Sequence, residues 1–230
     1  VILATEQRAK LERSERLAAV AAMLYLVFNE GYSVNSDDAS ARAALCDEAI
    51  RLTRMLLGLF SAEPEIMGLA ALMLLQHARA AARFDAESQI ILLEDQNRAL
   101  WNRDKIAEGL ALLEKAIRHQ RRGPYQVQAA IAALHARATT FADTDWAQIE
   151  LLYAALEQLQ PSPVVTLNRA VAVSKAQGAE PALAMIEPLA QRLDPRRRRR
   201  HQRPAADRVD AALQGPALGP AGHPVQHEVG

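Results

Sequence analysis

Three polar segments of the sequence contain the residue types that molecular recognition requires. They are residues 29–33, residues 95–101 and residues 123–135, and an Asp-Trp pair follows the third at residues 145–146. Each combines amides or charged groups with a tyrosine or tryptophan, and these aromatic side chains offer a large contact area together with a polar atom. The sequence therefore predicts an interaction surface. Its candidate residues are Asn29, Glu30, Tyr32, Asp95, Gln96, Arg98, Trp101, Tyr125, Gln126, Gln128, His135, Asp145 and Trp146.

A second interpretation of the same residues stays open. They could be helix caps, turns and a buried polar network that holds helices in register. Gly31 follows an apolar helix face directly, and we expect it to end that helix as a left-handed C-cap.

Catalytic and metal-binding patterns are missing from the sequence. The six histidines form no His-x3-His pair, and Cys46 has no second cysteine with which to share a zinc ion. Neither a phosphate-binding loop nor a Gly-x-Ser-x-Gly motif is present. We therefore expect no enzyme activity, no catalytic residue, no cofactor and no metal.

Composition limits the class of protein further. The chain has 230 residues, of which half are hydrophobic, and a formal net charge of zero. Residues 1–193 hold 20 basic and 23 acidic residues, so this part lacks the basic excess of a nucleic-acid-binding surface. A single cysteine fits a reducing cytoplasm, and no apolar stretch approaches the ~18 residues of a membrane span.

Apolar residues recur at helical spacing through most of the chain and predict an all-α fold. The expected helices cover residues 17–28, 49–59, 64–74, 106–117, 124–134, 146–159, 163–171 and 181–193. Prolines at 64, 124 and 163 suit the first turn of a helix. The pattern breaks at residues 84–97, where periodicity allows either an extended segment or one helical turn.

Short breaks between the last four expected helices imply antiparallel neighbours. The segment from Ala155 to Leu183 resembles a tetratricopeptide repeat boundary, because small alanines allow two helices to pack closely. We therefore predict antiparallel helix pairs arranged as a tetratricopeptide-like solenoid or bundle, followed by a disordered or irregular tail.

The expected organisation has four parts. Residues 1–14 form a linker or the end of an upstream region, residues 15–102 an N-terminal helical part, and residues 103–193 the repeats. Residues 194–230 are rich in Arg, Pro and Gly, and cannot bury enough apolar surface to offset the entropy lost on ordering. The unbroken arginines 196–200 could bind phosphates, although a solvated tail is favoured. A shifted reading frame would also produce such a segment. Because Val1 is not a methionine, we expect a fragment of a longer chain.

Several motifs in a fixed order resemble those of one known family. They are ERLAAV (15–20), YLVFNEGYS (25–33), LEDQxRxxW (93–101), GPYQxQAAIAAxH (123–135), DTDW (143–146) and PSPVVxLNRAVA (161–172). Together they resemble the helical, tetratricopeptide-like C-terminal extension of a family of bacterial extracytoplasmic-function sigma factors. The resemblance covers about residues 12–190.

The resemblance implies a regulatory domain that modulates transcription initiation. Its expected partners are the sigma regions of the same parent chain, RNA polymerase, or a regulatory protein or peptide, without direct promoter binding or membrane contact by this segment. The alternative is a stand-alone tetratricopeptide-like scaffold that binds a peptide or small ligand. The chain departs from the family in lacking the upstream sigma regions and the final helices beyond Asp194. It also has Asn97 and Asn102 where the family usually has aspartates.

Overall fold

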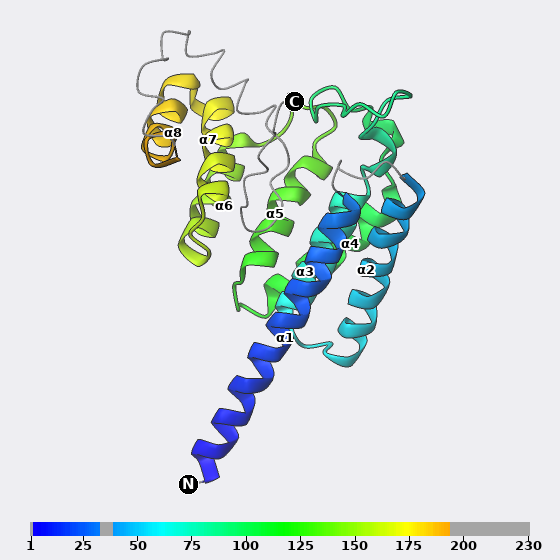
Figure 1. Cartoon of the computed structure of the whole chain (residues 1–230), viewed down its shortest axis with the longest axis vertical. Coiled ribbons are helices and arrows are strands. Elements are labelled where there is room, and N and C mark those ends of the chain that lie inside the picture. The colour runs from blue at the N-terminus through cyan, green and yellow to red at the C-terminus, as the bar shows by residue number, and fades with distance from the viewer. Residues whose placement is uncertain (1, 33–38, 194–230) are drawn as a thin grey trace, which may run out of the picture. The chain divides into compact units, whose positions relative to one another are not determined.

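The computed structural model describes residues 2–32 and 39–193, and these residues are helical apart from their connecting loops (Figure 1). The single β-bridge among them joins Phe84 to Ile90, so the prediction of an all-α fold is confirmed for this part of the chain. The predicted tail at residues 194–230 lies outside the described residues. The α-helices are α1 (Ile2–Tyr32), α2 (Ala39–Leu59), α3 (Pro64–His77), α4 (Arg103–Arg118), α5 (Pro124–Arg137), α6 (Trp146–Leu159), α7 (Pro163–Gln177) and α8 (Ala179–Leu193), with 3-10 turns η1 (Ala80–Ala82) and η2 (Arg98–Leu100).

The chain divides into two compact units. The first holds α1 and the part of α2 up to Leu52, and the second starts at Thr53 and holds α3 to α8. The predicted boundary at residues 102–103 falls inside the second unit, at the start of α4.

The first unit corrects the expectation for Gly31. Helix α1 continues through Gly31 to Tyr32, and the only glycine with a positive φ in the described chain is Gly178. The reason is aromatic packing along one helix face. The ring of Tyr32 stacks on that of Phe28 at 5.4 Å between centroids, and Phe28 stacks on Tyr25 at 6.4 Å. These contacts stabilise one more helical turn, and glycine tolerates helical dihedrals.

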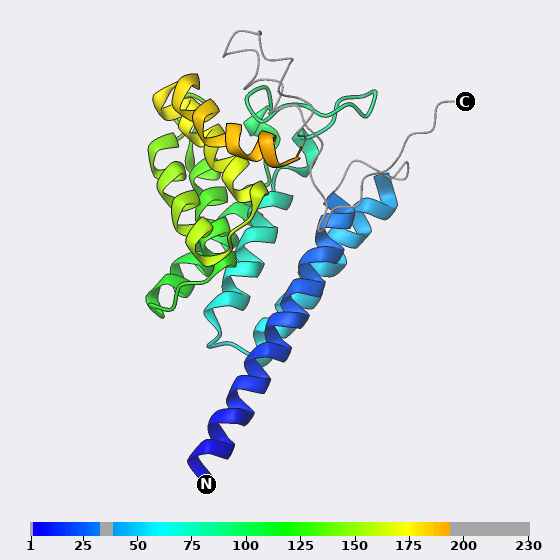
Figure 2. The ribbon, with the colours of Figure 1, turned by 60° about the vertical axis from the view of Figure 1, so that its left-hand side comes forward.

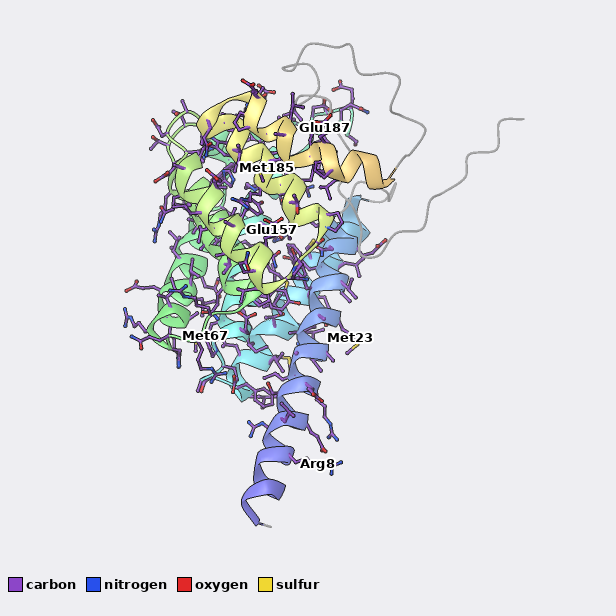
Figure 3. All side chains as sticks on the ribbon, turned by 90° about the vertical axis from the view of Figure 1, so that its left-hand side faces the viewer. Arg8, Met23, Met67, Glu157, Met185 and Glu187 are labelled. Atoms are coloured by element: carbon purple, nitrogen blue, oxygen red, sulfur yellow. The ribbon has the colours of Figure 1, made fainter. Side chains whose placement is uncertain are left out.

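Helix α3 is the centre of the second unit. Every residue from Ile66 to Leu75 is buried, so the helix is apolar on all sides and needs neighbours on more than one side. It packs against α4 and α5, and Figure 3 shows Met67, one of its fully buried residues, inside the bundle. Pro64 starts α3, as predicted from the sequence.

Glycines make the close packing of α3 possible. A Cβ at Gly68 would lie 2.7 Å from the backbone nitrogen of Gln126 in α5. A Cβ at Gly109 in α4 would lie 2.9 Å from Cγ of Leu75. Real Cβ atoms do not approach so closely, so α4 and α5 can reach α3 at these points only through glycine.

The remaining helices follow in sequence order. Helix α5 packs on α6, α6 on α7 and α7 on α8, and Figure 2 shows these three adjacent pairs. Ile149 and Leu156 of α6 lie between Val127 and Ile131 of α5 and Ala172 of α7. The last helix begins at Ala179, two residues before the predicted start at Pro181, because Gly178 ends α7 with a φ of 99°. Among the described residues, no helix is both long enough and apolar enough to span a bilayer.

Replacing Gly68 tests the close approach of α3 and α5. We expect Gly68→Ala to lower the free energy of unfolding by about 1–3 kcal/mol, since the methyl group meets the Gln126 backbone. The matched control is Gly58→Ala in α2, where an added Cβ meets nothing within 4 Å. That variant should gain about 0.5–1 kcal/mol from its better helix propensity. Urea unfolding followed by circular dichroism measures both, and equal shifts of the same sign would contradict the packing described.

Candidate interaction site

The predicted surface residues occupy three places in the structure. Asn29, Glu30 and Tyr32 end α1 in the first unit, where Asn29 is half-buried and Glu30 is exposed. The other candidates lie in the second unit, and there most of them form two separate groups, while Asp95 is exposed in the loop before α4 and Gln128 is half-buried on α5. One group surrounds Arg98 at the C-terminal end of α5, and the other surrounds Gln126 at its N-terminal end.

Arg98 joins the loop before α4 to the end of α5. Its Nη1 donates to the carbonyl oxygens of His135 at 2.5 Å and Ala138 at 2.8 Å. These carbonyls belong to the last turn of α5, where a cation is favoured by the helix dipole. The guanidinium also lies 4.5 Å from the ring centroid of Trp101, whose side chain is 3% exposed. A cation over a buried indole face is attracted by the ring quadrupole.

The Arg98 guanidinium has no carboxylate partner within ion-pair distance among the described residues. Burial, and then the charge of Arg79, lower its pKa, whereas the nearby Asp143 raises it. Arg79 also lies over the Trp101 ring, at 5.9 Å from the centroid. Arg98 remains charged at every physiological pH. Backbone carbonyls, the indole face of Trp101 and the nearby Asp143 therefore stabilise the charge of the Arg98 guanidinium.

His135 and Trp146 complete this group, which we name the Arg98 cluster: Arg98, Trp101, His135 and Trp146. The His135 and Trp146 rings meet edge to face at 5.2 Å, and Phe141 meets Trp146 in the same way at 5.2 Å. Burial, followed by the charges of Arg79 and Arg98, lowers the pKa of His135 to about 4. The imidazole is therefore neutral at pH 7 and serves as an aromatic packing group.

The turn before α6 has carboxylate caps. Asp143 accepts hydrogen bonds from the hydroxyls of Thr139 at 2.6 Å and Thr140 at 2.8 Å, and these bonds lower its pKa. Asp145 accepts from the backbone N–H of Gln148 at 2.9 Å and is the N-cap of α6. The predicted Asp145-Trp146 pair thus combines a helix cap with a packed ring.

Gln126 belongs to the second group, with a glutamate that the sequence analysis did not select. Glu65 of α3 accepts from the backbone N–H groups of Tyr125 at 3.1 Å and Gln126 at 3.2 Å, and from Nε2 of Gln126 at 3.0 Å. The carboxylate thereby caps the N-terminus of α5, where negative charge is favoured. A Cβ at Gly123 would lie 2.1 Å from the carboxyl carbon of Glu65, which explains the glycine that precedes Pro124.

The loop before α4 contains both buried and exposed polar residues. Gln96 is buried and donates from Nε2 to the carbonyl of Ile91 at 3.0 Å, while Asp95 is exposed. Asn97 accepts from the N–H of Ala99 at 3.0 Å, and Asn102 accepts from that of Lys105 at 2.9 Å. Both asparagines are N-caps, a role that aspartate performs equally well. The aspartates that the resemblance leads one to expect at these two positions would form the same caps.

Other charged residues join α6 to α7. Figure 3 marks Glu157 on α6, which accepts from Nη1 of Arg169 at 3.0 Å and from the Thr166 hydroxyl. These bonds lower the pKa of Glu157, with the hydroxyl as the largest cause. The sequence analysis did not select Glu157, Arg169 or Thr166, and it also missed Glu65, Arg79 and Phe141. Each of these residues makes its contact with a position on a different helix or loop, which no local pattern indicates. In the described part of the chain, no group of three or more His, Cys, Asp or Glu side chains could hold a metal ion.

Comparison with known proteins gives two matches. Residues 16–117 match a family of unknown function (DUF6596). An uncharacterized protein of Rhizobium meliloti (strain 1021) is 67% identical over 183 residues, which cover 80% of this chain and 43% of that relative. The chain therefore spans less than half the length of this relative. No solved structure matches the chain.

Removing the Arg98 guanidinium should detach the loop from α5. We expect Arg98→Ala to lower the free energy of unfolding by about 2 kcal/mol, because two charge-assisted hydrogen bonds to partly buried carbonyls are lost. The control is Arg103→Ala, an exposed residue whose hydrogen bond to the Arg98 carbonyl is 3.4 Å long. Its effect should stay within about 0.5 kcal/mol. Urea titrations compare the two, and equal losses would argue against the capping role of Arg98.

His135 should make stability depend on pH in one defined window. Its pKa is about 4 in the folded chain and about 6.5 unfolded, so the unfolded state binds the proton first as pH falls. Stability from this residue is complete above pH ~6.5 and is lost progressively towards pH 4, by up to about 3 kcal/mol. The difference in unfolding free energy between the native chain and His135→Gln, measured from pH 7.5 to 4, isolates this contribution. A constant difference over that range would show that His135 does not titrate in this way.

Proposed function

We propose that this chain is the helical C-terminal extension of an extracytoplasmic-function sigma factor and that it regulates transcription initiation by RNA polymerase. The observation that carries the proposal is the order of the six motifs along residues 15–172. The relative from Rhizobium meliloti supports it, because more than half of that protein lies outside the matched part. A protein of that length has room for polymerase- and promoter-binding regions next to a helical extension.

The proposed regulation works through contact between the extension and another part of the machinery. Arg98, Trp101 and Gln126 are engaged within the second unit, so their side chains shape the domain. Glu30 and Asp95 are exposed and are available to a partner. The proposed partners are the sigma regions of the parent chain or RNA polymerase. Within the same proposal, the helix pairs form a tetratricopeptide-like solenoid and the protein works in the cytoplasm.

A stand-alone scaffold is the second candidate function. Three large apolar side chains are exposed on α6 and α7, namely Leu151, Leu159 and Val164. Such side chains on adjacent antiparallel helices suit a groove that binds a peptide or small apolar ligand. A thermal-shift screen of the chain by itself distinguishes this candidate, since a scaffold should be stabilised by ligand without any sigma region.

Two expectations follow from the regulatory proposal, one for the coding sequence and one for transcription. The coding sequence upstream of Val1 should encode sigma regions, and reporter transcription driven by the complete product should depend on the exposed carboxylates. Changing Glu30→Ala and Asp95→Ala together should lower transcription about tenfold, since a lost contact of about 1.4 kcal/mol changes binding by that factor.

The control removes two carboxylates elsewhere. Glu114 and Glu187 are exposed on α4 and α8, and Figure 3 marks Glu187. The pair Glu114→Ala and Glu187→Ala should leave transcription unchanged. Normal transcription with Glu30→Ala and Asp95→Ala, at unchanged melting temperature, would refute these residues as contacts. An upstream sequence without sigma regions would refute the sigma-factor assignment itself.

A further inference from the structure

One segment of α1 is apolar on all sides of the helix. Residues 17–28 contain no charged residue, and the hydroxyl of Tyr25 is the only polar side-chain group among them. A helix that is apolar all round is normally buried, as α3 is. In this segment of α1, however, Ala21 and Phe28 are the only residues that are fully buried. One side of the segment is therefore apolar and open to solvent.

The open side has the spacing of a coiled-coil seam. Met23 is 58% exposed and Leu26 is 42% exposed, and Figure 3 shows the side chain of Met23 projecting outward from α1. Together with three other exposed residues they lie alternately three and four residues apart, which is the a/d repeat by which two helices pair. The five positions, which we name the α1 seam, are Arg16, Ala19, Met23, Leu26 and Glu30.

The residues beside the seam are apolar as well. Ala18, Ala22 and Val27 are exposed, so the apolar strip is wider than its central row. The solvent side of α2, in contrast, carries charges such as Glu48 and Arg51, which pair at 2.7 Å. Single exposed apolar residues are ordinary, but a continuous apolar strip marks an interface. The alanines also allow a second helix to approach to about 8 Å between axes.

Opposite charges at the two ends of the seam restrict what covers it. Arg16 and Glu30 each lie seven residues from Met23, about two helical turns in either direction. Neither forms an ion pair with another described residue. In a parallel pair of α1 helices, like charges would face each other at both ends. In an antiparallel pair centred on Met23, Arg16 of each copy lies beside Glu30 of the other.

We propose that the α1 seam is the interface of a homodimer, in which the α1 helices of two copies pack antiparallel with Met23 at the two-fold axis. Such an interface uses the same surface of both copies, so the apolar strip and both ion pairs occur twice. Two helices paired over about 22 Å bury less than the ~800 Å² per partner of a standard interface. We therefore expect a weak dimer, with a dissociation constant on the order of 10 µM.

The proposed dimer does not depend on the sigma-factor function. Pairing covers Glu30, so the dimer and the contact proposed above for that carboxylate exclude one another. The oligomeric state tests the dimer, whereas the upstream coding sequence and reporter transcription test the function.

Sedimentation equilibrium of the 230-residue chain, from about 1 to 300 µM, measures the dimer. Met23→Lys brings two like charges together at the two-fold axis and should weaken dimerisation at least about tenfold. The matched control is Met55→Lys on α2, because Met55 is 56% exposed and lies outside the seam. This control should dimerise like the native chain. Circular dichroism and the melting temperature establish that both variants are folded.

Exchange of the terminal charges tests the antiparallel arrangement. Arg16→Glu alone, or Glu30→Arg alone, places like charges together at both ends and should weaken the dimer roughly fivefold at about 50 mM salt. The double variant Arg16→Glu with Glu30→Arg restores opposite charges and should recover the native dissociation constant. In a parallel dimer the single variants would leave like charges facing each other, so neither the loss nor the recovery would occur.

The possible results separate a second copy from other partners. A native chain that is monomeric over the whole concentration range, or equal weakening by Met23→Lys and Met55→Lys, overturns the seam as a dimer interface. Absence of recovery in the charge-exchanged double variant overturns the antiparallel pairing. A complete gene product that stays monomeric at concentrations where the 230-residue chain dimerises shows that another part of the parent chain covers the seam, and it overturns the second copy as the partner.

Discussion

The second unit depends on the burial of α3, a helix that is apolar on all its sides. Such a helix is stable in water only when neighbouring helices cover it, and α4 and α5 do so at distances that Gly68 and Gly109 permit. Glu65 then fixes the direction of α5, because its carboxylate caps the first turn of that helix. The positions of α6, α7 and α8 follow, since each packs on the helix before it.

Arg98 makes the second polar contact that positions α5, at the C-terminal end of that helix. The residue comes from a loop that has little apolar core of its own, yet its guanidinium reaches the last carbonyls of α5 and lies over Trp101. The two ends of α5 are thus held by opposite charges, a carboxylate at the N-terminus and a guanidinium at the C-terminus. Both charges complement the helix dipole, so polar residues that suggested recognition also stabilise the fold.

This double use of polar residues changes how the candidate surface is understood. Internal contacts engage the side chains of Gln96, Arg98, Trp101 and Gln126. The interpretation of these residues as a polar network that holds the helices in register describes these contacts well. In the same loop before α4, the side chains of Glu87, Ile90, Leu92 and Asp95 are exposed to solvent. Within this loop, some polar side chains therefore stabilise the fold and others face solvent.

The sequence by itself determined that the helices form, because apolar periodicity is a local signal that a single helix must satisfy. Prolines at first turns also located the starts of α3, α5 and α7, whereas α1 and α2 begin at Ile2 and Ala39, well before their predicted starts at residues 17 and 49. The prediction failed at Gly31, where stacking of Tyr32 on Phe28 extends α1 past a residue that usually ends helices. Only the tertiary structure decided which polar residues meet. The pairs Glu65–Gln126 and Arg98–His135 are 61 and 37 residues apart in the chain, and no periodicity connects positions on different helices. Such contacts depend on how the helices pack, and packing is set by the sum of many weak apolar contacts rather than by any local pattern.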